Sequence, residues 1–350
     1  MDVGVNYPWV DYGWDFGVAP PGARVGNDPN WLAQIDHDLG LFLKIGISVV
    51  RWFILGDGLT YGSSVSAPRW DESTGKWRFD PPKLSAELLS HFEQLLVKFS
   101  EFNRKSDRPI LLMPVLIDYL FCQPGVPIVR KDDSKQQSIP DEDWVKRGRA
   151  DAITDSAKQA EFLRNVLQPL LQTASKFNPS VIYAWDIINE PELITNNWHP
   201  DGQRSHPVDD FAMRAFIEDS KSMIRYFNFK PTIGFYSLDT MRRTRINADI
   251  NQFHYYNHPT KESKLEKNPF SPPGIVGEFA TDSVKDFWPD LRGQSQTVLN
   301  RLRFSQAQGY RLALPWRFND KKDRDDHTSW TPEVEQQFEC FVFGRNCPKK

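Results

Sequence analysis

The sequence predicts an α/β fold, a (β/α)8 barrel made by one domain that spans residues 1–350. Two observations predict it. Short apolar segments alternate with amphipathic stretches along the chain, the order typical of a parallel sheet covered by helices. The apolar segments number eight, and a last helical stretch follows the eighth, which favours a closed barrel over an open doubly wound sheet.

The expected strands are short, apolar and rich in β-branched residues. They lie at Val3–Tyr7, Ile47–Phe53, Ile110–Ile117, Val181–Ile188, Thr232–Tyr236, Ile250–Tyr255, Gly274–Glu278 and Arg311–Trp316. The third is almost entirely apolar, as expected of a strand that is covered on both faces.

The expected helices carry apolar residues three and four positions apart. They lie at Trp31–Lys44, Leu84–Phe99, Ser156–Lys176, Val208–Phe227, Gln294–Gln308 and Pro332–Phe343. Between residues 257 and 273 the composition is rich in Lys, Glu, Pro and Ser, so we expect the helix after the sixth strand to be truncated.

Two extended loops follow the second and third strands, at Ile54–Pro82 and Asp118–Asp155. The first contains a segment that predicts a hairpin turning at Thr74–Gly75. Loops that follow barrel strands lie on the carboxyl-end face, where barrel enzymes build their active sites. Long loops on that face are more often functional than not.

Composition excludes several function classes. The formal net charge of −3 argues against a nucleic-acid or anionic-membrane surface. No apolar stretch approaches the length of a membrane span. We expect a monomer, and we expect no cofactor. We also expect no metal site, because His254 and His258 have metal-ligand spacing but lack the glutamate and the helix of a zinc protease motif.

Aromatic and cysteine residues give weaker indications. Twelve residues are tryptophan, and flat rings at a barrel mouth would suit sugar stacking. Trp9 and Trp14 follow the first strand and could form such platforms, or they could plug the barrel. The hairpin residues Trp70 and Trp77 are weaker platform candidates. Cys340 and Cys347 could form a small disulfide or remain two thiols.

Two glutamates stand at the ends of expected strands. The segment Ala184–Pro191 reads Ala-Trp-Asp-Ile-Ile-Asn-Glu-Pro, and Gly274–Phe279 reads Gly-Ile-Val-Gly-Glu-Phe. In a barrel, Glu190 and Glu278 would enter one cleft from the fourth and seventh strands. Glycosidic bond cleavage needs such a pair, one carboxyl to protonate the leaving oxygen and one to attack the anomeric carbon. We predict a separation of about 5–5.5 Å, the value typical of retaining enzymes.

With these motifs the whole chain resembles the clan A glycoside hydrolases, and family 5 most closely. The matching pieces are Leu43–Arg51, Asn189–Pro191, His254–Tyr256, Gly277–Phe279 and Trp316. The resemblance implies that Glu190 is the acid/base and Glu278 the nucleophile. It also implies that Arg51 and Tyr256 contact the nucleophile and that Trp316 floors the sugar subsite.

Residue chemistry extends these roles. Arg51 and Tyr256 should hold Glu278 ionised and lower its pKa, while a drier setting should raise the pKa of Glu190. Asn189 should bind the sugar 2-hydroxyl. His254 should bind a sugar or orient Glu190, although a purely structural histidine is an alternative.

The sequence departs from the family at the third strand, where Asp118 stands instead of a histidine-containing segment. Asp118 could contact the sugar or could cap the loop that follows.

The expected activity is retaining hydrolysis of a β-linked oligo- or polysaccharide, with internal cleavage favoured. A barrel that binds carbohydrate without cutting it is an alternative, although both glutamates are present. A transglycosylase would use the same pair. Residues Met1–Val5 lead directly into an expected strand and no signal peptide is visible, so we expect either a cytoplasmic protein or one whose leader has been removed. The resemblance favours a secreted or periplasmic protein.

Overall fold

The computed structural model describes residues 1–8, 15–17, 31–61, 67–132, 137–177, 181–198, 206–256, 265–280, 297–318 and 332–347. Trp9 and Trp14 lie outside these ranges. Among the described residues, no helix is both long enough and apolar enough to cross a membrane.

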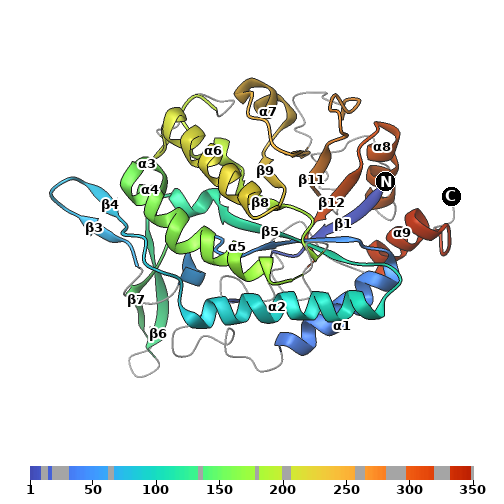
Figure 1. The fold of residues 1–350 in the computed structure, drawn as a ribbon, viewed down its shortest axis with the longest axis horizontal. Helices are drawn as coiled ribbons and strands as arrows, with labels where there is room; N and C mark the ends of the chain where they lie inside the picture. The colour runs from blue at the N-terminus through green and yellow to red at the C-terminus, as the bar shows by residue number, and fades with distance from the viewer. Residues whose placement is uncertain are drawn as a thin grey trace.

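A closed parallel barrel forms the centre of the molecule and confirms the predicted fold (Figure 1). Around the barrel the order is β1, β12, β11, β10, β9, β8, β5, β2. Strand β1 pairs in parallel with both β2 and β12, which closes the sheet and excludes the doubly wound alternative. The strands are β1 (Asp2–Asn6), β2 (Val49–Phe53), β5 (Leu111–Asp118), β8 (Trp185–Asn189), β9 (Pro231–Phe235), β10 (Ile250–His254), β11 (Ile275–Ala280) and β12 (Leu312–Trp316).

Helices surround the barrel in the order expected of alternating strands and helices (Figure 1). They are α1 (Trp31–Ile45), α2 (Ala86–Lys105), α3 (Asp151–Thr154), α4 (Ser156–Phe162), α5 (Gln168–Ser175), α6 (Asp210–Tyr226), α7 (Leu238–Thr244), α8 (Thr297–Ala307) and α9 (Pro332–Phe343). Short helical turns occur at η1 (Leu59–Tyr61), η2 (Tyr119–Cys122) and η5 (Pro191–Leu193), and the π-helical segment η3 (Leu163–Leu167) joins α4 to α5.

Helix α2 shows how a local pattern sets an element. Leu88, Phe92, Leu95, Leu96 and Phe99 form its buried stripe. Ser85 caps its start by accepting a hydrogen bond from the backbone N–H of Leu88. The helix continues past the predicted end at Phe99 to Lys105, and Phe102 in this added stretch packs against the core.

The loop after β2 contains the predicted hairpin, formed by β3 (Arg69–Asp71) and β4 (Lys76–Arg78). Trp70 pairs directly with Trp77, and their ring centroids lie 5.7 Å apart. The loop after β5 contains a second hairpin that the sequence analysis did not predict, β6 (Val126–Asp132) with β7 (Gln137–Lys146). Figure 1 shows both hairpins at the same end of the barrel.

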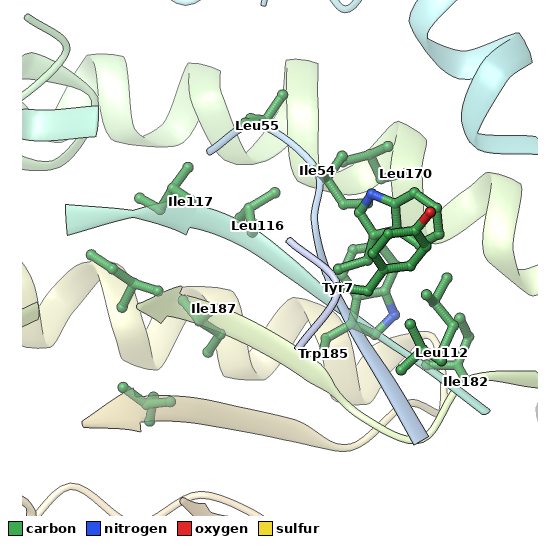
Figure 2. Close-up of a cluster of buried hydrophobic side chains, with 14 of the residues drawn as sticks. Tyr7, Ile54, Leu55, Leu112, Leu116, Ile117, Leu170, Ile182, Trp185 and Ile187 are labelled. Carbon is green, nitrogen blue, oxygen red and sulfur yellow. The ribbon is translucent and has the colours of Figure 1, made fainter. Parts of the chain in front are cut away.

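The main apolar core lies between the barrel and its helices. Figure 2 shows part of this core, with Leu170 of α5, Trp185 of β8 and Ile54 among its buried side chains. A separate, smaller cluster contains Val49, Met113, Ala184, Ile250, Ile275, Leu312 and Leu314. Because side chains two residues apart share a strand face, the residues two positions after Val49, Ala184 and Ile250 point to the same side as this cluster.

Those residues are Arg51, Asp186 and Gln252, and all three are buried. A layer of polar side chains therefore lies between the small apolar cluster and the carboxyl ends of the strands.

The C-terminal segment is joined back to α9 by a disulfide between Cys340 and Cys347. Of the two alternatives left open by the sequence, the structure has the bonded one. Cys122 is a free thiol buried in η2.

Candidate active site

Glu190 follows the last residue of β8 and is 9% exposed. Its backbone is left-handed, with φ 48° and ψ 53°, and its N–H donates to the Gly234 carbonyl over 2.7 Å. A non-glycine residue held in this region is strained, and such strain concentrates at functional sites. Pro191 then begins the turn η5, so the Glu190 side chain leaves the strand at the barrel mouth.

His254, the last residue of β10, is the hydrogen-bond partner of the Glu190 carboxyl group. Its Nδ1 lies 2.8 Å from Glu190 Oε1 and 3.4 Å from Glu278 Oε2. Burial lowers the pKa of His254 to about 4, so the ring is neutral at neutral pH. Of the two roles expected for His254, the structure places it where it can orient Glu190.

Burial also raises the pKa of Glu190 to about 7, and the positive charge of Arg51 opposes that rise. A neutral histidine provides no charge that would stabilise the carboxylate. Glu190 can therefore hold a proton near neutral pH, as a general acid must.

Glu278 lies on β11 and is 3% exposed. Arg51 Nη1 donates to its Oε1 over 2.6 Å, and the Tyr256 hydroxyl donates to its Oε2 over 2.7 Å. Both expected contacts to the nucleophile candidate are present. A carboxylate held by two donors has a fixed orientation.

The expectation of a lowered pKa for Glu278 is wrong. Burial raises the pKa of Glu278 above its ordinary value, and the Arg51 charge and the Tyr256 hydrogen bond reduce that rise without reversing it. The burial of Glu278 decides the direction of its pKa shift, and no local sequence pattern reveals how deeply a residue is buried.

The two carboxyl groups are close. A carboxylate oxygen of Glu190, one of Glu278 and a ring nitrogen of His254 all lie within 4.8 Å of one another. These three are a geometrically possible metal-ligand group, but Arg51 and Tyr256 already donate to the Glu278 oxygens. A guanidinium cation 2.6 Å from Glu278 makes this an unfavourable place for a metal ion.

Arg51, on β2, uses every N–H of its guanidinium. It donates to Glu278, to Asn6 Oδ1 (2.9 Å) and to Asn189 Oδ1 (2.7 Å). Its remaining two bonds, from Nε (2.9 Å) and Nη2 (2.7 Å), both reach Asp186 Oδ2. Its five N–H groups therefore make five hydrogen bonds to four acceptor atoms, which satisfies this fully buried side chain.

Asn189 and Asp118 are linked at the ends of β8 and β5. Asn189 Nδ2 donates to Asp118 Oδ2 over 2.8 Å, which fixes the amide orientation. Asp118 Oδ1 accepts from the Leu120 N–H over 2.8 Å. Asp118 therefore caps the loop and braces Asn189; direct contact between Asp118 and a sugar stays a prediction. Burial raises the pKa of Asp118 to about 8.

Trp316 ends β12 and is partly exposed. Its ring packs edge-to-face against Phe53, with centroids 6.0 Å apart. The positions of Trp9 and Trp14, the other expected sugar platforms, lie outside the described residues.

Sequence reasoning missed Asp186 and Gln252. Asp186 lies in the same strand as the acid/base motif, and a charged residue within an apolar strand was the available signal. Its main partner, Arg51, comes 135 residues earlier in the chain, so no local pattern joins the two.

No protein-family model matches the chain, and no curated protein sequence matches it. Solved structures do match. A β-mannanase from the blue mussel Mytilus edulis is 16% identical, with 99% of this chain and 92% of that chain covered and a TM-score of 0.62.

An endo-1,4-β-mannanase from Rhizomucor miehei is 13% identical, with coverages of 97% and 93% and a TM-score of 0.55. A family 5 lichenase from Caldicellulosiruptor sp. F32 is 10% identical, with coverages of 97% and 92% and a TM-score of 0.54. The chain has the fold of these glycoside hydrolases. That fold is the one the sequence motifs implied.

Proposed function

We propose that this chain is a retaining glycoside hydrolase of the family 5 type that cleaves β-linked glycans, with Glu278 as nucleophile and Glu190 as acid/base. The observation that carries the proposal is the contrast between two neighbouring carboxyl groups. Glu278 accepts hydrogen bonds from Arg51 and Tyr256, whereas Glu190 is next to a neutral histidine and has a pKa raised to about 7.

The spacing of the two carboxyl groups supports retention. Retaining glycosidases place them about 5–5.5 Å apart, whereas inverting enzymes need about 6.5–9.5 Å to fit a water between carboxylate and sugar. One carboxylate oxygen of Glu190 lies within 4.8 Å of one of Glu278, an approach that supports the shorter class.

In the first step, a carboxylate oxygen of Glu278 would form a bond to the anomeric carbon while the bond to the leaving oxygen breaks. Glu190 would give its proton to that oxygen, so the departing sugar leaves as an alcohol. The products are a glycosyl ester on Glu278 and an ionised Glu190.

In the second step, the ionised Glu190 would take a proton from water as that water attacks the anomeric carbon. The ester bond to Glu278 breaks, and both carboxyl groups return to their starting states. His254 would turn the Glu190 carboxyl group toward the cleft in both steps.

Three other residues have supporting roles in the proposal. Asn189 keeps one amide N–H beyond the hydrogen bond to Asp118 and can donate it to the 2-hydroxyl of the sugar. Partly exposed Trp316 can stack under the pyranose ring at the cleavage point. Tyr256 and Arg51 would hold Glu278 in line with the anomeric carbon.

The structural neighbours guide the substrate choice. They are a β-mannanase, an endo-1,4-β-mannanase and a lichenase, so β-mannans and β-glucans are the first candidate substrates and internal cleavage the first candidate mode. We further propose a secreted or periplasmic monomer. The Cys340–Cys347 disulfide supports an oxidising compartment.

The test is hydrolysis of a panel of β-1,4-mannan, β-1,4-glucan, mixed-linkage glucan and xylan. NMR of the first-formed reducing ends would give the stereochemistry. We expect one or more polymers to release β-anomers, and we expect Glu278→Gln and Glu190→Gln to lose that activity. α-Anomers from the wild-type chain, or full activity in Glu278→Gln, would contradict the proposal.

A further inference from the structure

Beneath the two glutamates lies a third buried carboxylate, Asp186 on β8. It is fully buried and is not one of the residues expected to touch the sugar. Its Oδ2 accepts from Arg51 Nε, Arg51 Nη2 and Gln252 Nε2, over 2.9, 2.7 and 2.9 Å. Its Oδ1 accepts from the Gly234 N–H over 3.0 Å. All four partners are donors, which suits an ionised carboxylate that can only accept.

The surroundings are shaped to admit this group. A Cβ on Gly234 would lie 2.9 Å from Arg51 Nη2 and 3.1 Å from Asp186 Oδ2. A Cβ on Gly277 would lie 2.7 Å from the Gln252 side chain. Strands β9 and β11 therefore carry glycine where the polar layer crosses the barrel. A side chain at either position would come too close to Arg51 or Gln252.

Arg51 thus divides one positive charge between two carboxylates. Asp186 contacts its Nε and Nη2 edge, and Glu278 contacts Nη1. In a buried site, charge is compensated by neighbours because water is excluded. The more of the cation Asp186 neutralises, the less of it remains to stabilise ionised Glu278.

We propose that Asp186 is a positioning residue that sets how much positive charge Arg51 presents to Glu278, and so fixes the pH range in which the nucleophile is ionised. This inference rests on the proposed function for its catalytic meaning. A nucleophile bound by an uncompensated guanidinium would be held too stably to attack well. Asp186 keeps Glu278 oriented by Arg51 without that excess stabilisation.

The charged and titratable groups around Arg51 and Glu278 come from four strands and from the residues that follow two of them. They are Arg51 on β2, Asp186 on β8, His254 on β10 and Glu278 on β11, together with Glu190 after β8 and Tyr256 after β10. Of these, His254 is neutral at neutral pH, so Asp186 is the group whose charge can be removed without touching either proposed catalytic glutamate.

The test is Asp186→Asn in the full chain labelled with 13C at the glutamate carboxyl groups. The Glu278 resonance is assigned by its loss in Glu278→Gln. Because Arg51 becomes undercompensated, we expect the pKa of Glu278 to fall by about 1 pH unit. The acidic limb of kcat/KM should move down by the same amount, with kcat reduced. An unchanged Glu278 titration would overturn the proposal.

Asp38→Asn is the matched control. Asp38 is a buried carboxylate on α1 that accepts from the Tyr7 hydroxyl and Gln34. Its change should lower thermal stability and leave the Glu278 titration in place. A purely structural Asp186 would behave in the same way as Asp38.

Gln252→Met is the second variant, used if Asp186→Asn does not fold. It removes a neutral donor and leaves Asp186 charged and less satisfied. Arg51 is then compensated more fully, and the Glu278 pKa should rise. A fall or no change would contradict the proposal. The carboxyl titration needs no turnover, so failure of the wild-type chain on every glycan would contradict the proposed function and leave this test intact.

Discussion

Glu278 and Glu190 are the same residue type and their carboxylate oxygens lie within 4.8 Å of each other, yet their surroundings differ. The Glu278 carboxylate accepts hydrogen bonds from the Arg51 guanidinium and from the Tyr256 hydroxyl. The Glu190 carboxyl group is hydrogen-bonded to the neutral imidazole of His254, and the Glu190 backbone has a left-handed conformation. Burial raises the pKa of both, so burial does not assign the roles. The difference lies in which carboxyl group has a fixed positive partner, and this difference is the basis on which we propose Glu278 as the nucleophile.

The largest expected effect comes from Glu278→Ala. The glycosyl ester cannot form, and we expect kcat to fall on the order of 10⁵-fold, as when a nucleophile is removed from other hydrolases. The check is the initial rate on the best polymer of the panel. Glu93→Ala on α2 is the control: Glu93 is partly exposed and pairs with Lys176, and this variant should match the wild-type rate.

Glu190→Ala removes the proton donor instead. On a natural glycan the rate should fall about 10²–10⁴-fold, the range typical of general acid–base catalysis. An aryl glycoside with a good leaving group needs no proton, so its first step should be nearly as fast as in the wild type. Burst kinetics of aryl release measure that step. If Glu190→Ala lost the same factor in rate on the natural glycan and on the aryl glycoside, Glu190 would not be the proton donor. That result would contradict the proposed difference between the two glutamates.

Tyr256→Phe tests the neutral donor at Glu278. A hydrogen bond to a charged group is worth about 1.5–3 kcal/mol, so we expect kcat/KM to fall about 10- to 150-fold with little loss of fold stability. Tyr226→Phe on α6 is the control, because Tyr226 is 81% exposed and remote from the cleft's hydrogen bonds. Equal rates for Tyr256→Phe and wild type would remove Tyr256 from the account.

The pH dependence gives the mildest test. Glu190 must carry its proton to act as an acid, and its pKa is about 7. Activity on a natural glycan should therefore be present below pH 7 and fall as pH rises through 7. The kcat/KM profile measures this limb. A limb that persisted unchanged in Glu190→Gln, measured on an activated aryl glycoside, would belong to another group.

Much of the fold could be predicted because its signals are local. Strand β5 is an uninterrupted apolar run, and α2 has a clean buried stripe. The two glutamates were found because each stands at the end of an apolar segment of sequence, a pattern that needs no knowledge of distant contacts. Helix α7, seven residues long, and the hairpin of β6 and β7 were missed, because neither has an apolar period long enough to detect.

The electrostatics of the site could not be predicted, because they depend on distant pairs. Arg51 meets Asp186 and Glu278 only when β2, β8 and β11 share one barrel. The pKa of Glu278 moves opposite to the expected direction because depth of burial outweighs the contacts that residue chemistry suggested. Asp118 was ambiguous for the same reason, since its partner Asn189 lies on a neighbouring strand.

The central claim is the division of roles between Glu278 and Glu190, and azide rescue of the two alanine variants tests it most directly. With an activated β-aryl glycoside of a sugar that the wild type accepts, azide should enter the space left by Glu278 and give the α-glycosyl azide. In Glu190→Ala, azide should attack the ester on Glu278 and give the β-glycosyl azide. The opposite pairing of variant and anomer would contradict the account.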